Sequence, residues 1–253
     1  MDLDGACCLV VGGGRKVGRA LALQLAAHGC HVAVTYRTAV DEAREVARQI
    51  VAGGRRGAAV PMDVSARLDA THAVAAASEA LGGLDAVVYA ASGPFVPMPP
   101  QAIDEDLWNA SFDVLARGLF FVAQAARDHF IGSEPRAGAG KERGTIVALT
   151  DVGAEIPWAS FAGHCSAKAA QLMLVRVLAK AWAAEGIRVC GVAPGPMDVE
   201  DDPRREASLR AAARSPSGRL VQLSELFSGV RECLENPGLT GINLVVDAGF
   251  SLA

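Results

Sequence analysis

The sequence is short of tyrosine, carries no excess of positive charge and has no long apolar run. Its 253 residues include two tyrosines and have a formal net charge of -4, which excludes the basic footprint of a nucleic-acid-binding protein. No run approaches the roughly 18 uninterrupted apolar residues of a membrane span. The first residues, Met1 to Asp4, are acidic and lack the basic start of a secretory signal. We therefore expect a cytoplasmic protein with no nucleic-acid or membrane partner.

The cysteines show no metal-binding spacing and lie mostly in apolar runs, so we expect buried thiols in a reducing compartment and no metal site. They are Cys7, Cys8, Cys30, Cys165, Cys190 and Cys233. Apolar residues make up 51% of the chain, enough for a large core, and no change of composition divides it. Residues 1–253 are thus expected to form one dinucleotide-binding domain.

Strand-like and helix-like segments alternate along the chain, which predicts a doubly wound parallel sheet with helices on both faces. Strands are expected near residues 6–11, 30–35, 57–61, 85–90, 144–150, 187–192 and 242–246. Helices are expected near residues 17–28, 39–52, 67–81, 104–130, 162–185 and 222–234. A ligand of such a fold binds across the carboxyl ends of the strands. Residues 132–143 are predicted to be a surface loop, and 194–219 a substrate-loop excursion over the site.

Three glycines, Gly12 to Gly14, end the first apolar run, and a helical pattern begins at Val17. Glycines let the backbone turn sharply and approach a ligand, and the first amides of a helix favour an anion. No Gly-Lys-Ser/Thr follows, which excludes a phosphate-binding loop of the nucleotide triphosphatase type. The context of strand, turn and helix predicts binding of a dinucleotide pyrophosphate.

The end of the second strand carries Arg37 and Thr38 where enzymes that prefer NAD usually have a carboxylate. Arg15 and Lys16 lie in the facing turn. Three cations suit a 2′-phosphate through charge-assisted hydrogen bonds, so the sequence predicts NADPH. Asp63 and Val64, which close the third strand, are expected beside the adenine.

These motifs, with several later ones, resemble the short-chain dehydrogenase/reductase family over nearly the whole chain. The later motifs are Tyr89-Ala90-Ala91-Ser92, Lys168 in a Ser-Ala-Lys-Ala-Ala run, Pro194-Gly195, and Val246-Asp247-Ala248-Gly249. The resemblance implies a Rossmann fold and a nicotinamide cofactor. The predicted cofactor-binding residues are Gly12, Gly14, Arg15, Lys16, Val17, Gly18, Arg37, Thr38, Asp63, Val64, Ala90, Ala91, Ser92, Lys168, Pro194 and Gly195.

Within that family the chain looks most like the pteridine reductase group. That group also has a basic residue where Lys16 replaces the middle glycine, and an Asp where other members have the catalytic Ser, here Asp151. The catalytic Tyr of the family lies four residues before the Lys, and this chain has His164 there. Leu115 stands at the position of the family's helical Asn.

The altered site favours reduction of an iminium ion over reduction of a ketone. Hydride addition to a ketone creates an alkoxide that needs a proton donor, whereas addition to C=N⁺ gives a neutral amine. Asp151, His164 and Lys168 are the predicted catalytic residues, with Asp151 stabilising the cation. Phe95, Trp158 and Phe161 are predicted to face the substrate by stacking on a flat or cationic ring, although helix packing also explains the last two.

We therefore predict an NADPH-dependent reductase of a pterin-like substrate, a cyclic imine or a hemiaminal-bearing natural product of secondary metabolism. Two alternatives remain at this point. One is a non-redox cyclase, dehydratase or isomerase that uses His164 with Asp151 as an acid–base pair. The other is a catalytically inactive NADPH-binding protein in which His164 is a bystander. The resemblance also implies a homodimer or homotetramer, associated through helices 104–130 and 162–185.

Overall fold

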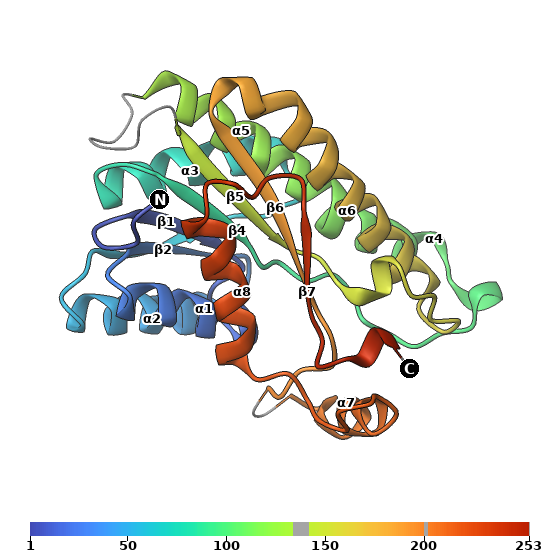
Figure 1. Ribbon diagram of the computed structural model, residues 1–253. Helices are drawn as coiled ribbons and strands as arrows, with labels where there is room; N and C mark the ends of the chain where they lie inside the picture. The colour runs from blue at the N-terminus through green and yellow to red at the C-terminus, as the bar shows by residue number, and fades with distance from the viewer. Residues whose placement is uncertain (134–141, 200–201, 253) are drawn as a thin grey trace.

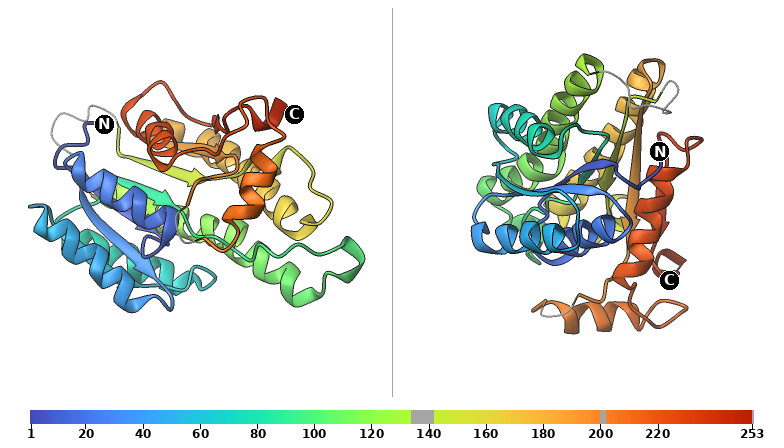
Figure 2. Two further views of the ribbon diagram at one scale, coloured as in Figure 1. Left: turned by 90° about the horizontal axis from the view of Figure 1, so that it is seen from below. Right: turned by 90° about the vertical axis from the view of Figure 1, so that its left-hand side faces the viewer.

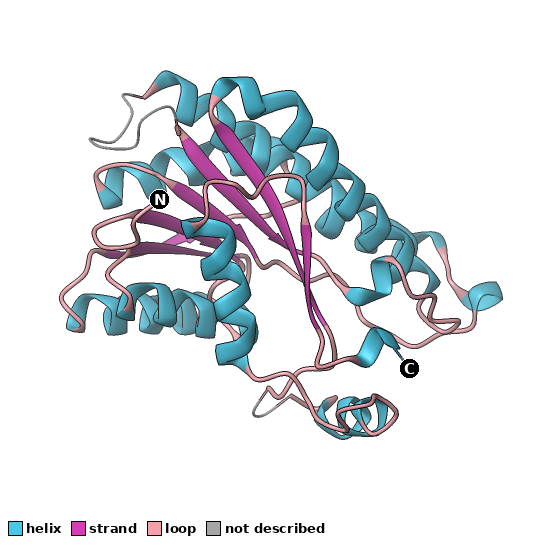
Figure 3. Cartoon of the chain, viewed as in Figure 1, coloured by secondary structure: helices cyan, strands magenta, loops and turns pink. Residues whose placement is uncertain are grey.

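A seven-stranded parallel sheet forms the centre of the molecule. The computed structural model describes residues 1–133, 142–199 and 202–252. The strands are β1 (Cys7–Val11), β2 (His31–Tyr36), β3 (Gly57–Pro61), β4 (Ala86–Tyr89), β5 (Gly144–Leu149), β6 (Ile187–Pro194) and β7 (Asn243–Val246). Their order is β3-β2-β1-β4-β5-β6-β7, and every neighbouring pair is parallel (Figure 3). The predicted doubly wound fold is confirmed.

Helices cover both faces of the sheet (Figures 1 and 2). One face packs against α1 (Lys16–Ala27), α2 (Val40–Ala52) and α8 (Leu223–Glu235). The other packs against α3 (Arg67–Leu81), α5 (Gly118–Gly132) and α6 (Ala162–Trp182). Side chains of β1 alternate between the two cores, with Leu9 and Val11 on the α3 side and Cys8 and Val10 on the α1 side. Because both faces are buried, the strands read as continuous apolar runs.

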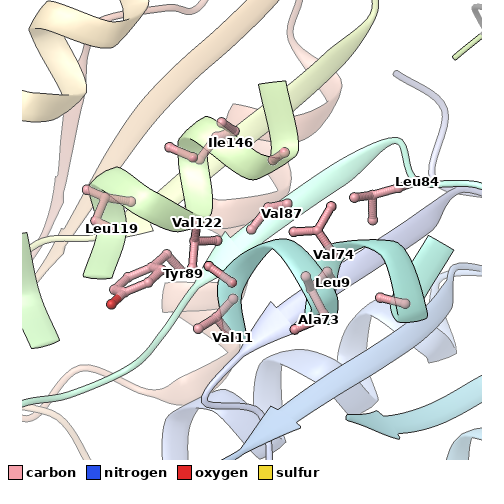
Figure 4. Packing of buried hydrophobic residues seen from close by; sticks show 14 of the residues in the cluster. Leu9, Val11, Ala73, Val74, Leu84, Val87, Tyr89, Leu119, Val122 and Ile146 are labelled. Atoms are coloured by element: carbon pink, nitrogen blue, oxygen red, sulfur yellow. The ribbon is translucent and has the colours of Figure 1, made fainter. Parts of the chain in front are cut away.

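The segment predicted as one helix over 104–130 is interrupted. It consists of α4 (Glu105–Phe112), a π-helical turn over Asp113–Arg117, and α5. A π-turn carries one extra residue and disturbs the regular backbone ladder. The carbonyl of Val114 accepts a hydrogen bond of 2.5 Å from the Tyr89 hydroxyl, which lies at the end of β4 (Figure 4). The long-range contact from Tyr89 could not be seen in the helical periodicity of the segment.

The predicted excursion 194–219 leaves the sheet after β6 and contains a short helix, α7 (Arg205–Ala212). Its two ends are held together by a parallel bridge between Met197 and Val221. Asp201 lies outside the described residues, and so do residues 134–141 of the predicted surface loop. None of the helices in the described ranges is long and apolar enough to cross a membrane.

Candidate active site

The carboxyl ends of the parallel strands meet at one edge of the sheet, and the predicted site residues lie in the loops that follow them. The short turns after β1 and β4 are in close contact. A Cβ atom on Gly12 would lie 2.9 Å from the Cα atom of Ala91. Gly12 also has φ +77°, which favours glycine. A Cβ atom on Gly18 would collide with the carbonyl oxygen of Gly12. The glycines therefore permit the close approach of three backbone segments.

The helix that follows this turn has an open N-terminus. Helix α1 begins at Lys16 with no side-chain cap and no acidic residue in its first turn. Its first amides are therefore suited to an anion such as a pyrophosphate. This cradle of glycines and amides fits a dinucleotide.

Each of the three predicted 2′-phosphate-binding cations has a carboxylate partner in this structure. Arg15 pairs with Glu42 of α2, and Lys16 Nζ lies 3.1 Å from Asp202 Oδ2. Arg37 Nη1 lies 3.8 Å from Asp63 Oδ2 across the ends of β2 and β3. The three cationic side chains are 57%, 45% and 66% exposed, respectively. Exposed ion pairs are weak, so these partners leave the cations open to a phosphate dianion.

The remaining predicted cofactor residues border the same edge. Asp63 accepts hydrogen bonds from Ser65, which together with Arg37 hold the pKa of the Asp63 carboxyl below its usual value. Val64 packs against the core, Thr38 is exposed after β2, and Val17 packs against the core on the α1 side.

The loop of Ala90, Ala91 and Ser92 follows β4, and its first amide, that of Ala90, donates a hydrogen bond to the Val11 carbonyl. Gly195, after Pro194, approaches β7 so closely that a Cβ atom would lie 2.7 Å from the Cβ atom of Asp247.

Asp151 and His164 form a pair at the end of β5. The Oδ2 atom of Asp151 lies 3.5 Å from His164 Nε2, and its Oδ1 atom accepts a hydrogen bond of 2.7 Å from the Gly153 amide. Asp151 therefore caps the 3₁₀ turn η3 (Val152–Ala154) and faces the imidazole at the same time. His164 is 8% exposed, and its Nδ1 atom is buried with no hydrogen-bond partner among the described residues. The pair thus places a carboxylate and an imidazole side by side.

Lys168 lies one helical turn after His164 and is buried. Its Nζ atom donates to the carbonyl oxygens of Leu149 and Thr150, at 2.7 and 3.0 Å, and to Gln171 Oε1 at 2.9 Å. Burial lowers the pKa of Lys168 to about 8, against the opposing effect of the Asp151 charge. The spacing of His164 and Lys168 on one helix face predicted their proximity, and the structure brings them together with Asp151.

The three predicted substrate-facing residues form an aromatic wall around His164. Phe95 and Phe161 stack with ring centroids 4.3 Å apart, and the Trp158 ring meets Phe95 edge-on at 6.2 Å. The His164 ring lies edge-on to Phe95 at 4.8 Å. Since these rings contact one another and the imidazole, they belong to one cluster at the carboxyl edge of the sheet.

Neither tyrosine of the chain supplies a phenol to this cluster. Tyr89 is fully buried and bonded to Val114, and burial raises the pKa of its hydroxyl well above the usual value. Tyr36 ends β2 and packs on the α1 side of the sheet. Leu115, in the π-helical turn, is fully buried. The aromatic cluster around His164 therefore contains no tyrosine hydroxyl.

Several residues of the site were not predicted from the sequence. Phe250 meets the Trp158 ring at 6.4 Å, and the Arg204 guanidinium lies 5.1 Å from the centroid of Phe95. Both come from distant parts of the chain, and no local motif marks them. Gln171, by contrast, follows Lys168 by three residues, so helical spacing could have identified it.

Comparisons with known proteins agree with this geometry. A family model described as Enoyl-(Acyl carrier protein) reductase matches residues 13–251. The 3beta-hydroxysteroid dehydrogenase 1 of Eggerthella lenta is 32% identical over 257 residues, covering 99% of this chain and 95% of that protein. The L-rhamnose 1-dehydrogenase (NAD(P)(+)) of a Sphingomonas species is 30% identical over 261 residues, covering 98% and 97%.

Solved structures share the same arrangement. A short-chain dehydrogenase from Burkholderia cenocepacia, crystallised in complex with NADP, is 29% identical with a TM-score of 0.86, and the match covers 99% of each chain. A short-chain dehydrogenase/reductase from Serratia marcescens is 27% identical with a TM-score of 0.88, covering 99% of this chain and 100% of that one. The chain belongs to the short-chain dehydrogenase/reductase family. It is an oxidoreductase, and the fold of this family binds a nicotinamide cofactor and a small-molecule substrate.

The lowered pKa of Lys168 predicts a specific dependence of stability on pH. In the unfolded chain the lysine binds its proton up to about pH 10.4, whereas in the folded protein it loses the proton near pH 8. The folded state therefore bears the full cost of a buried ammonium below pH 8. That cost fades between about pH 8 and 10.4, a change on the order of 2–3 kcal/mol in favour of folding.

The measurement is the free energy of unfolding of the wild type and of Lys168→Met at several pH values across this window. We expect the wild type to gain stability relative to the variant as pH rises. A constant difference between the two proteins would show that the pKa of Lys168 is not lowered.

Proposed function

We propose that this protein is an NADPH-dependent reductase that transfers hydride to a C=N or iminium substrate. The observation that carries the proposal is the pair of Asp151 and His164, which stands at the site edge in place of a phenolic proton donor. A carboxylate here favours a cationic substrate, and the missing phenol is tolerated by a reaction that needs no proton.

Reduction of a ketone and reduction of an iminium ion differ in whether the product needs a proton. When bound, the reduced cofactor supplies the hydride, which forms a C–H bond at the substrate carbon while the π electrons of C=N⁺ become the nitrogen lone pair and the cofactor is left oxidised. A ketone would leave an alkoxide, which requires protonation. An iminium gives a neutral amine, so the positive charge that Asp151 faces disappears during the reaction.

The residues of the site have separate roles in this proposal. Asp151 is anchored by the Gly153 amide, so its second oxygen is oriented toward the site before substrate arrives. Lys168 holds the nicotinamide ribose, as in related enzymes, by exchanging one of its protein acceptors for a ribose hydroxyl. His164 orients the substrate beside Asp151 and, for a hemiaminal, assists departure of the hydroxyl group as a general acid.

We also propose that the chain is close to the pteridine reductase group, which would bring it to the same class of substrate. Asp151 and Lys16 match that group at two positions where most of the family differs. Lys16 has φ +46°, a backbone conformation that glycine adopts more easily, as expected where a basic residue replaces the middle glycine. A pterin and a cyclic imine present a reducible C=N bond, and a hemiaminal-bearing natural product forms one when it loses water.

The preference for NADPH is supported by the charges beside the predicted adenosine site. Arg15, Lys16 and Arg37 come from two separate segments and lie at the same edge of the sheet. The Burkholderia cenocepacia structure holds NADP, whereas the Sphingomonas enzyme is named for both cofactors. The proposed preference for NADPH therefore rests on these three cationic side chains.

A non-redox cyclase, dehydratase or isomerase is the second candidate, because a carboxylate and an imidazole at 3.5 Å also form an acid–base pair. An inactive NADPH-binding protein is the third. The relatives are named as dehydrogenases and reductases, which favours redox chemistry.

Association of subunits is also part of the proposal. Large apolar side chains are exposed on α5 and α6, namely Phe120, Ile131, Met173 and Val177. Exposed apolar patches of this kind mark contact surfaces, which supports a homodimer or homotetramer formed through these helices.

The first prediction concerns the cofactor. A charge-assisted contact contributes about 1.5–3 kcal/mol, so Arg37→Ala should weaken NADPH binding at least about tenfold and leave NADH binding unchanged. Titration of both cofactors measures this. Arg48→Ala, which removes an arginine that is 75% exposed on α2, is the matched control and should change neither affinity. Equal affinity of the wild type for NADPH and NADH would refute the assignment.

The second prediction concerns redox stoichiometry. The reductase should consume one NADPH for each amine formed, which the absorbance of the reduced nicotinamide follows during turnover. A non-redox enzyme should form product with no change in this absorbance. An inactive binding protein should bind NADPH and form no product.

The third prediction separates His164 from Asp151 on a preformed, N-alkylated iminium, which has no proton to lose. His164→Phe should lose less than about tenfold in kcat/KM, well below the 10²–10⁴ usual for a missing general acid. Asp151→Asn should lose more, because it deletes the charge that faces the cation while keeping the shape. If His164→Phe is inactive while Asp151→Asn is nearly intact, the imidazole is the essential acid and the iminium mechanism is wrong.

A further inference from the structure

Arg204 lies over the ring of Phe95, the residue through which the aromatic wall contacts His164. Its guanidinium carbon is 5.1 Å from the centroid of the Phe95 ring, within the roughly 6 Å that defines a cation–π contact. Phe161 stacks on the same ring, with centroids 4.3 Å apart. A ring that was predicted to face the substrate is therefore already in contact with a cation of the protein itself.

The group that lies on Phe95 has the shape and charge of an iminium-like ligand. A guanidinium is flat, and its positive charge is delocalised over its C–N bonds. Cyclic iminium and amidinium ions are also flat cations, so they can make the same contact with an aromatic face. No preformed cavity is needed, because the ligand takes the space that the guanidinium leaves. The Arg204 side chain is 48% exposed, so it can move aside into solvent.

Asp202 holds Arg204 in this position. Its carboxylate accepts hydrogen bonds from Arg204 Nε at 3.0 Å and Nη2 at 2.8 Å, and from the Arg204 amide at 2.9 Å. The same carboxylate lies 3.1 Å from Lys16 Nζ, and the Asp202 side chain is 9% exposed. The Asp202–Arg204 pair thus joins the glycine turn, through Lys16, to the aromatic wall, through Phe95.

The two contacts of this pair depend on each other. When two connected groups bind to one body, each contact holds the other group near its partner, so the loss of one contact weakens the other. Lys16 is also a predicted ligand of the cofactor 2′-phosphate, and a phosphate makes charge-assisted hydrogen bonds that compete with those of a carboxylate. A phosphate bound at Lys16 would therefore detach Asp202 and loosen Arg204 from Phe95.

We propose that the face of Phe95 beneath Arg204 is a binding site for a planar cation, that Arg204 occupies it in this structure, and that a phosphate at Lys16 releases Arg204. The choice of an iminium ion as the natural ligand rests on the proposed function. Arg204 is a specificity-determining residue, because a cation restores the contact that Arg204 gives up whereas a neutral ring does not. Binding of the cofactor and binding of a cationic substrate are then positively coupled through Asp202.

The test measures binding of benzamidinium, a flat amidinium cation, and of benzamide, its neutral counterpart, by titration calorimetry. Arg204→Ala should bind benzamidinium about fivefold more tightly than the wild type, because the probe no longer has to displace a cation–π contact. The affinity for benzamide should change by less than about twofold. Arg210→Ala is the matched control and should change neither affinity, since this arginine of α7 is 68% exposed and also pairs with a carboxylate.

A second substitution separates the ring from the charge. Removal of any cation near a binding site favours binding of another cation, but only the ring contact depends on Phe95. In the Arg204→Ala background, Phe95→Leu should therefore cancel the fivefold gain, which is about the size of one cation–π contact. Arg204→Ser should reproduce the gain of Arg204→Ala, which guards against a local folding defect in one variant.

The coupling is tested with adenosine 2′-phosphate, which carries the phosphate predicted to contact Lys16 and has no nicotinamide. At saturation it should tighten benzamidinium binding to the wild type by up to about fivefold, the range of an exposed ion pair. The effect should be absent from Arg204→Ala, in which the face of Phe95 is already free. This comparison excludes a direct attraction between the phosphate and the probe.

The outcomes separate this proposal from the proposed function. Unchanged or weaker binding of benzamidinium to Arg204→Ala, or a gain that survives Phe95→Leu, would overturn the site. An equal effect of adenosine 2′-phosphate on the wild type and on Arg204→Ala would overturn the coupling. If the probes bind as expected but no imine consumes NADPH, the site stands and the reductase assignment fails. If an imine is reduced while Arg204→Ala changes no affinity, the reductase stands and the site fails.

Discussion

A buried ammonium group must find acceptors, and the way Lys168 meets this requirement organises the whole site. Its donors reach two consecutive carbonyl groups at the end of β5, so the first turns of α6 are fixed against that strand. His164, one turn earlier on the same helix, is consequently held beside Asp151, which directly follows those carbonyls. The remaining donor is fixed by Gln171, itself fully buried. The single buried charge of Lys168 thus sets the positions of α6, of the end of β5 and of the Asp151–His164 pair.

The substrate side of the site depends on this anchor in turn. The aromatic wall contacts the His164 ring through Phe95, and Phe161 precedes the first turn of α6. Leu107 and Ser111 of α4 lie close to His164, and α4 leads through the π-turn to α5. In that turn the Val114 carbonyl accepts the hydrogen bond from Tyr89, so the end of β4 is tied to the segment that joins α4 to α5.

The sequence predicted the sheet because apolar runs and glycine turns are local signals. All seven strands were located, since each reads as an apolar run, and the central strands β1, β4, β5 and β6 are buried almost throughout. The meeting of Asp151, His164 and Lys168 also followed from local facts, namely a strand end and an i, i+4 spacing. The break in the helix over 104–130 did not: the π-turn accepts a hydrogen bond from Tyr89, which is distant along the chain, and no local pattern marks that contact.

The contacts made by the 194–219 excursion could not be predicted from the sequence either. Asp202 accepts hydrogen bonds from both Lys16 and Arg204, and these hydrogen bonds, above all those from Arg204, hold the pKa of its carboxyl far below the usual value. Arg204 in turn covers the face of Phe95. Periodicity carries no information about such pairs, because exposed charged side chains can reach many partners. Phe250 was absent from the predicted substrate-facing residues because it meets Trp158 from the far end of the chain, where no local motif marks it.

The left-handed backbone of Lys16 has a consequence for the evolution of this turn. A residue with a Cβ atom at φ +46° costs roughly 1–2 kcal/mol relative to its relaxed conformation, a cost that glycine avoids. Folding stability alone thus favours glycine at this position. The lysine is a trade-off in which the protein is less stable than it could be and gains a positive charge beside the glycine turn that follows β1.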